Sequence, residues 1–455
     1  MATAASIISR LIIPHPSEPA LLVTEGRGGA PELPSVVDTT GWFWARVDWL
    51  NALVRERYGL TTTVLRCVSS TVDEETKTGT RIYVLDTHPP ASAPAGTRWA
   101  RRDDLARRPL GDAIQQAQVE TWLAEAAGAP ISPLRAPWAR PGWFAEAAGW
   151  VERTVAAHGV NQTGAVEQVR AWTISTILTA PTDAGDVYFK ASGASFPREA
   201  AITAMLAANW PRLLTPVLDV DASRSWLLMH DLAGMRLDRT ADVTRWEAAL
   251  RTYAGVQIEA IGHTDALLAA GCQDRRLAGM HGEIDAALAD TASMAPDHPN
   301  RLTDEEIDAV RALAPMLHAA VDRLAAGPIP ETLEHGDFHP GNIVDTTDTI
   351  RIYDWSDACV AHPFFSLLPF FAYNYPLPET RAAVPRLRTA YLEPWTRYAP
   401  MAALLVMAEE ARRIAVVQQV MSYRHILETV EPALRWEWPD AIPYFLRMLL
   451  RDPTP

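Results

Sequence analysis

One short stretch constrains this chain more than any other. Residues 334–344 read E-H-G-D-F-H-P-G-N-I-V, and residues 351–355 read R-I-Y-D-W. An apolar run therefore leads into a glycine-bearing loop that presents Asp337, and Asn342 follows in the same loop. A second apolar run then ends in Asp354. Three oxygen-bearing side chains are thus placed at the ends of predicted strands, where a fold can bring them together.

These residue types suit phosphoryl transfer. A carboxylate that can accept a hydroxyl proton is one requirement, and an amide oxygen and a second carboxylate that can hold a hard cation are the others. Magnesium keeps several waters, so Asn342 and Asp354 can suffice once nucleotide phosphates complete the shell. The alternative is a pair of surface loops with incidental acidic residues, but chance rarely places every member in order between strand-like runs.

The pattern H-G-D-x-H-x-x-N, followed by a strand ending in D-W, resembles the aminoglycoside phosphotransferase and choline kinase-like family. The resemblance implies an α+β, two-lobed, protein-kinase-like fold with a small antiparallel β lobe and a mainly helical large lobe. It implies that Asp337 is the catalytic base or orients the acceptor hydroxyl, and that Asn342 and Asp354 hold Mg²⁺. ATP or GTP would be the phosphoryl donor.

The chain departs from this family after the second strand. Relatives commonly continue with G-D-P and a later Asp that braces the catalytic loop, whereas residues 360–367 read V-A-H-P-F-F-S-L. Ser366 stands in place of the bracing acid, so support for the loop must come from elsewhere. We expect His335 to anchor the loop, while Asp357 could touch the metal or be an ordinary solvated acid.

A three-stranded meander is predicted over residues 166–190, because the apolar periodicity there is two. Its last strand carries Lys190, one of only two lysines in the chain, and a lysine supplies a compact point charge. The family resemblance places Lys190 beside the α and β phosphates of the nucleotide. Glu199, in the next predicted helix, is the expected partner of Lys190, although an acid at a helix N-terminus is also favoured by the helix dipole alone.

Further nucleotide contacts follow from the same resemblance. The first hairpin of the meander lacks the glycines of protein kinases, so backbone amides and the hydroxyls of Thr173 or Ser175 would contact the phosphates. Met229 and Asp231 fall where the chain leaves the small sheet, and backbone groups there would meet the nucleotide base.

Composition and the positions of proline and glycine predict four segments in the chain. Residues 1–127 form an α+β unit, and residues 128–142 are a proline-rich linker. The family resemblance places the small lobe at residues 143–235 and the large lobe, with the catalytic loop and the substrate pocket, at residues 236–455. Apolar spacing of three to four predicts helices in the large lobe at residues 244–260, 277–288, 303–325, 378–392, 400–422 and 439–450.

The first segment resembles a Nudix domain in its order of elements, with a predicted helix over residues 42–58 that ends in R-E-R-Y-G-L. Nudix hydrolases chelate metal through several glutamates on this helix, but only Glu56 is present at the expected positions. One carboxylate is a poor divalent-cation site. We therefore expect a hydrolytically inactive scaffold or cap, with a family-specific α+β cap as the alternative and an active Nudix hydrolase as the least favoured one.

The net charge of −14 argues against a nucleic-acid partner, which would need a basic stripe. A cationic small acceptor is compatible with this charge but not required by it. Three scattered cysteines, no long apolar run and no apparent secretion signal predict a cytoplasmic protein without a membrane partner. The competing functional hypothesis is a non-catalytic nucleotide-binding pseudokinase or scaffold. The acceptor and the oligomeric state are not predicted.

Overall fold

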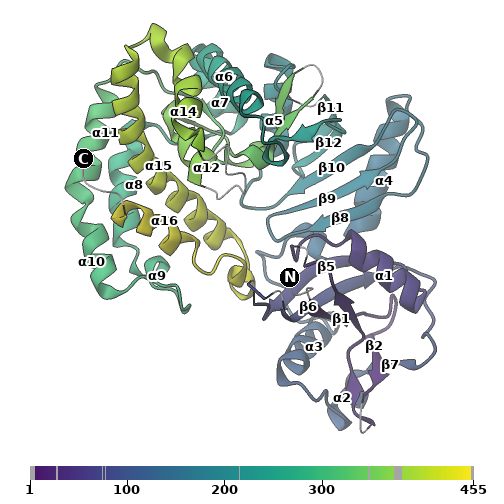
Figure 1. Ribbon diagram of the computed structural model, residues 1–455. Helices are drawn as coiled ribbons and strands as arrows, with labels where there is room; N and C mark the ends of the chain where they lie inside the picture. Colours follow the sequence, from purple (N-terminus) through teal and green to yellow (C-terminus); the bar gives the residue numbers. More distant parts are fainter. Residues whose placement is uncertain are drawn as a thin grey trace. The chain divides into compact units, whose positions relative to one another are not determined.

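The computed structural model describes residues 6–26, 29–41, 43–73, 75–76, 78–214, 216–346, 349–372 and 382–451 of the 455-residue chain. It divides into two compact units. Unit 1 comprises residues Met1–Ala194 and Val430–Arg435, and unit 2 comprises Ser195–Thr429 and Trp436–Pro455. Both contain helices and sheets, which confirms the predicted α+β class (Figure 1). The four-segment division at residues 127, 142 and 235 stays a prediction.

Unit 1 begins with two small sheets and the helices that cover them. The first sheet has the strand order β4-β1-β6-β5 and the second has the order β3-β2-β7. The strands are β1 (Ser6–Ile12), β2 (Ala20–Glu25), β3 (Pro31–Glu32), β4 (Ser35–Asp38), β5 (Thr62–Ser70), β6 (Thr78–Thr87) and β7 (Thr97–Arg101), and the helices are α1 (Asp48–Tyr58), α2 (Arg102–Arg107) and α3 (Ala113–Ala126). The sequence pattern predicts strands at residues 20–23, 62–69 and 81–85 and a helix at residues 111–127, and β2, β5, β6 and α3 confirm these. It does not predict β1, β3, β4, β7 or α2.

Helix α1 begins later than predicted. The apolar spacing predicted a start at Trp42, which lies outside the described residues, but the helix starts at Asp48. The preceding backbone runs alongside a strand instead: Val47 N donates to Val169 O (3.0 Å) and Ala171 N donates to Ala45 O (2.8 Å). Pairing with a distant strand therefore replaces the first turns of the expected helix.

The predicted meander is present in unit 1. It consists of β8 (Glu167–Ala171), β9 (Ser175–Ala180) and β10 (Val187–Ser192), which pair antiparallel in chain order. Helix α4 (Trp143–Ala157) precedes it. The segment before α4 is packed: Arg135 is buried and forms ion pairs with Glu125 (2.7 Å) and with Glu431.

A buried glutamine joins β8 to β5. The side chain of Gln168 accepts a hydrogen bond from Val64 N (2.7 Å) and donates one to Val64 O (2.8 Å). Its amide oxygen also accepts from Asn51 Nδ2 (3.1 Å) on α1. Gln168 therefore satisfies a strand backbone in the way that another strand would.

We expect Gln168→Ala to lower the free energy of unfolding of unit 1 by about 2–4 kcal/mol, because it leaves two buried backbone groups of Val64 without a partner. Denaturant unfolding monitored by tryptophan fluorescence measures this change. Glu167→Ala is the matched control, because Glu167 is exposed on the same strand and should shift the free energy by less than about 0.5 kcal/mol. Equal effects of both substitutions would contradict the role assigned to Gln168.

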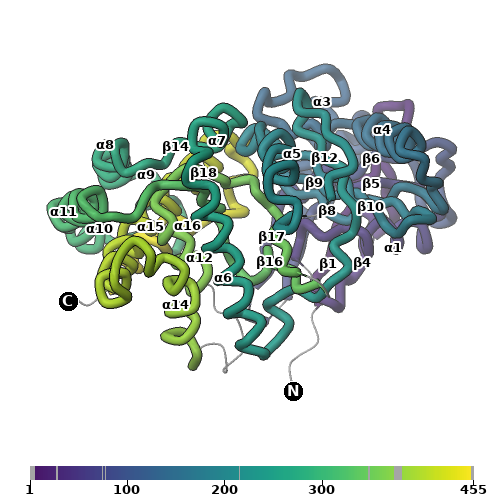
Figure 2. The backbone as a smooth tube through the Cα atoms, turned by 90° about the horizontal axis from the view of Figure 1, so that it is seen from above, coloured from purple at the N-terminus to yellow at the C-terminus, as the bar shows by residue number. Residues whose placement is uncertain are grey.

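Unit 2 is mainly helical, as the sequence predicted for the large lobe. In Figures 1 and 2 the helices α8, α11, α15 and α16 lie side by side, and contacts between them agree with this view. The helices of unit 2 are α5 (Glu199–Asn209), α6 (Val243–Glu259), α7 (Thr264–Ala270), α8 (Leu277–Ala289), α9 (Thr291–Met294), α10 (Asp304–Ala312), α11 (Ala314–Ala325), α12 (Leu367–Ala372), α14 (Val384–Leu392), α15 (Met401–Thr429) and α16 (Ala441–Leu450).

Two predicted helices differ from the structure. The single helix expected over residues 303–325 is two helices, α10 and α11, because Pro315 lies in the first turn of α11 and cannot continue the hydrogen-bond ladder of α10. The helix expected from residue 378 begins, within the described residues, as α14 at Val384, and residues 373–381 lie outside them.

Short strands of unit 2 carry the catalytic-loop motif. The hairpin of β16 (Ile343–Asp345) and β17 (Ile350–Ile352) pairs with β13 (Met235–Arg236). A second small sheet has the order β14-β18-β15, in which β15 (Thr332–Glu334) is antiparallel to β18 (Cys359–Ala361) and β14 (Gln273–Asp274) is parallel to β18. The strand pair β11 (Val217–Asp221) and β12 (Trp226–His230) also belongs to unit 2.

Within the described ranges, every helix is too short or too polar to cross a bilayer. The three cysteines, Cys67, Cys272 and Cys359, are buried and form no disulfide bond.

Candidate active site

The histidine before the predicted catalytic aspartate is a loop anchor. His335 is fully buried, and its Nε2 lies 3.0 Å from the carbonyl oxygen of Tyr353, to which it must donate. Its Nδ1 accepts a hydrogen bond from Asp337 N (3.3 Å). Burial lowers the pKa of His335 to about 4, so the ring is neutral at pH 7. These contacts support the anchoring role expected from the sequence rather than proton transfer.

Gly336 cannot be replaced without moving the backbone. Its φ of +80° lies in the left-handed region, and a Cβ added there would lie 2.3 Å from the carbonyl oxygen of Asp357. The motif therefore needs glycine at this position because the loop that follows β17 passes directly over it.

We expect Gly336→Ala to lower the free energy of unfolding by about 2 kcal/mol or more, because left-handed strain and a backbone clash add together. Thermal denaturation measures the loss. Gly282→Ala in α8 is the control: no atom lies within 4 Å of the added Cβ, so removal of a helical glycine should stabilise the protein by up to about 1 kcal/mol. A destabilisation of similar size in both variants would contradict this explanation.

Asp337 and Asn342 are held together by the loop between them. The side-chain nitrogen of Asn342 donates to Asp337 O (3.1 Å) and lies 3.5 Å from Asp337 Oδ2. The ring of His339 approaches the same carboxylate oxygen at 3.5 Å, and its Nδ1 accepts from Gly341 N (3.0 Å). Because these bonds use the amide nitrogen of Asn342, its amide oxygen is the atom suited to a cation.

Asp354 follows β17 with φ 63° and ψ 61°, a left-handed conformation that aspartate tolerates better than most residues. Its Oδ1 accepts a hydrogen bond from Ser356 Oγ (3.0 Å). The same loop is linked to the catalytic loop, since Tyr353 N donates to Asn342 O (3.1 Å). The structure thus brings together the three residues of unit 2 that the sequence assigned to the reaction, Asp337, Asn342 and Asp354.

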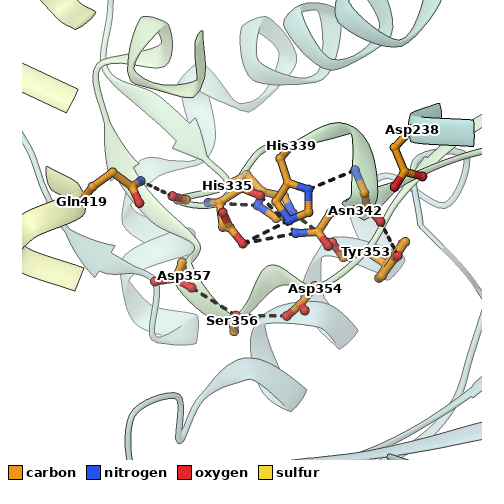
Figure 3. Close-up of polar contacts among 12 residues, drawn as sticks. Asp238, His335, His339, Asn342, Tyr353, Asp354, Ser356, Asp357 and Gln419 are labelled. Atoms are coloured by element: carbon orange, nitrogen blue, oxygen red, sulfur yellow. Dashed lines mark hydrogen bonds and ion pairs between the residues drawn. The ribbon is translucent and has the colours of Figure 1, made fainter. Parts of the chain in front are cut away.

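A third carboxylate lies in this region (Figure 3). Burial, and then the negative charges of Asp337 and Asp354, raise the pKa of Asp357 to about 8. Its Oδ2 lies 3.3 Å from Ser356 Oγ, the hydroxyl that also contacts Asp354. Asp357 is therefore part of the acidic cluster, rather than an isolated surface residue.

This donor set fits Mg²⁺ that is shared with a nucleotide. The oxygens of Asn342 and Asp354 are hard ligands, and their acidic surroundings favour a cation. Among the described residues, no group of three or more histidine, cysteine, aspartate or glutamate side chains is arranged to hold a metal by itself. A site of two protein ligands, completed by phosphate oxygens and water, agrees with both observations.

The structure shows which elements carry the residues predicted to bind the nucleotide, but the roles of these residues stay predictions. Lys190 is a buried residue of β10, and Thr173 and Ser175 lie at the turn between β8 and β9, all in unit 1. Glu199 is the buried first residue of α5, and Met229 is in β12 with Asp231 just after it, all in unit 2. The pairing of Lys190 with Glu199 also stays a prediction.

The sequence patterns did not identify three residues that support the loop, Glu334, Gln418 and Gln419. Glu334 is fully buried, and Gln418 and Gln419 on α15 bond the loop residues (Figure 3 shows Gln419). A glutamate at the end of the apolar run of β15 was the only sequence signal, because the two glutamines look like ordinary residues of a long helix.

The loop geometry and a family match together support a class, that of small-molecule phosphotransferases. Residues 183–404 match the model of the phosphotransferase enzyme family (APH). This segment contains Asp337, Asn342 and Asp354, whereas Thr173 and Ser175 precede it. The match supports the class that the motifs predicted, and it leaves the acceptor open. No curated protein matches the chain significantly.

Solved structures of small-molecule kinases and phosphotransferases resemble about two thirds of the chain. A choline/ethanolamine kinase family protein from Mesorhizobium loti matches with TM-score 0.45 and 17% identity, covering 68% of this chain and 95% of that one. A macrolide 2'-phosphotransferase from Brachybacterium faecium matches with TM-score 0.43 and 17% identity, covering 65% and 98%. A spectinomycin phosphotransferase in complex with ADP and spectinomycin matches with TM-score 0.43 and 13% identity, covering 67% and 95%. Because these TM-scores lie below 0.5, we take the class from the family match and the loop geometry.

Proposed function

We propose that this protein is an ATP- or GTP-dependent O-phosphotransferase that acts on a hydroxyl group of a small molecule. The observation that carries the proposal is the loop in which Asn342 fixes Asp337 within a segment that matches the phosphotransferase family. A loose phosphoryl-transfer transition state needs positioning and charge neutralisation more than covalent chemistry, and this loop offers both.

In this proposal Asp337 accepts or orients the acceptor hydroxyl. Asn342 and Asp354 hold Mg²⁺, which would neutralise charge on the β and γ phosphates when bound. Lys190 contacts the α and β phosphates with Glu199 as its partner, Thr173 and Ser175 contact the phosphates, and the backbone at Met229 and Asp231 contacts the base. The choice between ATP and GTP is part of the test.

The acceptor is proposed only as a class: an aminoglycoside or other antibiotic, an aminosugar, or a choline-like alcohol. The net charge of −14 and the acidic cluster around Asp337 are compatible with a cationic acceptor. We do not expect nucleic acid or membranes as partners, and we propose a cytoplasmic location.

The test is a transfer screen with γ-labelled ATP and GTP against aminoglycosides, macrolides, aminosugars, choline and other small alcohols, with and without Mg²⁺. We expect Mg²⁺-dependent label transfer to at least one acceptor. Absence of both transfer and nucleotide hydrolysis, despite binding of Mg²⁺–nucleotide in calorimetry, would favour the pseudokinase alternative. Absence of nucleotide binding would overturn both.

We propose that the first 127 residues are a scaffold or cap, and that any Nudix ancestry is hydrolytically inactive. The support is the single glutamate, Glu56, in α1 at the positions where that family carries several. Metal-dependent cleavage of a nucleoside diphosphate derivative by the full chain, if retained in Asp337→Ala and lost in Glu56→Gln, would overturn this assignment.

A further inference from the structure

The sequence leaves one question about the loop open: what replaces the bracing acid where Ser366 stands. Ser366 is fully buried, and its hydroxyl donates a hydrogen bond to Glu334 Oε1 (2.7 Å). Glu334 lies directly before the H-G-D motif and is itself fully buried. Position 366 carries no carboxylate, but its hydrogen-bond partner Glu334 supplies one from β15, the strand that leads into the loop.

Four donors surround this carboxylate. Oε2 accepts from Gly336 N (2.8 Å), from Gln418 Nε2 (2.7 Å) and from Cys359 Sγ (3.3 Å), and Oε1 accepts from Ser366. Burial raises the pKa of Glu334, and these four hydrogen bonds oppose that rise because they replace the lost water. The bond to Gly336 N fixes a backbone amide of the motif itself.

The same carboxylate is linked to a second amide of the loop. His335 N donates to the hydroxyl of Tyr253 (2.9 Å), which lies 3.1 Å from Ser366 Oγ. Since the Ser366 proton points to Glu334, the Tyr253 proton is the one shared between the two hydroxyls. The amides of two successive residues before Asp337 are thus tied to Glu334, one directly and one through Tyr253 and Ser366.

Helix α15 donates two hydrogen bonds to this arrangement. Its consecutive residues Gln418 and Gln419 bond Glu334 Oε2 and the carbonyl oxygen of Gly336 (2.8 Å), respectively. Figure 3 shows Gln419 reaching toward the loop from this helix. Gly336 is thereby fixed at both its amide and its carbonyl, immediately before the residue that must face the acceptor.

We propose that Glu334 is a positioning residue for Asp337 and supplies, from the strand before the loop, the brace that position 366 no longer provides. The inference rests on the proposed phosphotransferase function. Loss of the brace should let Asp337 move relative to the acceptor, and displacements of about 1 Å can lower a rate by about 100-fold.

The first test compares substitutions at position 334. We expect Glu334→Leu, which has similar volume and no acceptor, to lower kcat by about 10- to 100-fold while KM for Mg²⁺–nucleotide changes little. Glu334→Gln should lose less, because its amide oxygen can still accept from Gly336 N while its nitrogen donates to Ser366. The matched control is Glu331→Gln, the same change three residues earlier. The Glu331 side chain accepts a hydrogen bond from Leu277 N (2.5 Å), and its substitution should leave kcat unchanged.

The second test moves the carboxylate from position 334 to position 366. Ser366→Asp should inactivate the enzyme, because it places two carboxylates within hydrogen-bond distance in the core. The double variant Glu334→Gln, Ser366→Asp has one carboxylate again, and we expect it to recover kcat by about 10-fold or more over Ser366→Asp alone. A double variant no better than the single one, with both folded, would overturn the proposal.

Hydrogen exchange separates this inference from the proposed function. In Glu334→Leu the amide of Gly336 should exchange about 10-fold faster or more, and the amides of α15 outside the contact should not change. Faster exchange in a protein without any phosphotransferase activity would refute the function and keep the brace. A folded Glu334→Leu protein with unchanged exchange and unchanged kcat would refute the brace and keep the function. If Glu334→Leu does not fold, Glu334→Gln and the acid-moving pair carry the test.

Discussion

Asp337→Asn is expected to lower kcat by about 100- to 10,000-fold, the range for removal of a positioned general base. The substitution keeps the size of the side chain and leaves the hydrogen bond from Asn342 to Asp337 O in place, because that bond is to the backbone. Folding and nucleotide binding should therefore be preserved. Steady-state transfer kinetics, with calorimetry for Mg²⁺–nucleotide, measure the two effects separately.

Asp265→Asn is a suitable control for this variant. Asp265 is an exposed residue of α7 in the same unit, and its replacement by asparagine also removes one negative charge. We therefore expect kcat to stay within about twofold of the parent protein. A normal rate in Asp337→Asn would remove the central assignment, since this chain would then transfer phosphate without the carboxylate of its H-G-D motif.

Asp354→Asn is expected to have the second large effect. Loss of a carboxylate ligand should raise the Mg²⁺ concentration for half-maximal activity by about 10-fold or more and lower kcat by about 100-fold or more. Asparagine tolerates the left-handed backbone of this position, so the loop should persist. Binding of Mn²⁺ with nucleotide, followed by electron paramagnetic resonance, tests the metal site independently of turnover.

The stability of Asp354→Asn should change in the opposite direction to its activity. Without a cation, the negative charges of Asp337 and Asp354 oppose ionisation of Asp357 and contribute to its raised pKa. Removal of one charge should bring that pKa down and leave the metal-free protein equally or more stable at pH 7. A clear loss of thermal stability, together with unchanged Mg²⁺ dependence, would show that Asp354 is structural and not a metal ligand.

Local patterns predicted much of the secondary structure. Alternation of apolar residues identified the meander that carries Lys190, and apolar spacing of three to four identified most helices of unit 2. Errors arose where a remote partner intervened. The backbone before α1 pairs with β8 instead of continuing the helix, and no local pattern contains that information.

By itself the sequence indicated the class and predicted the residues at the centre of the site. The spacing of Asp337, Asn342 and Asp354 follows from a loop and a hairpin closed by neighbours in the chain. Only the tertiary structure decided what holds that loop. Glu334 meets Ser366 at a separation of 32 residues and Gln418 at a separation of 84, and Gln168 meets Val64 at a separation of 104. Such contacts depend on how buried polar groups find donors and acceptors in the packed core, which periodicity along the chain does not encode.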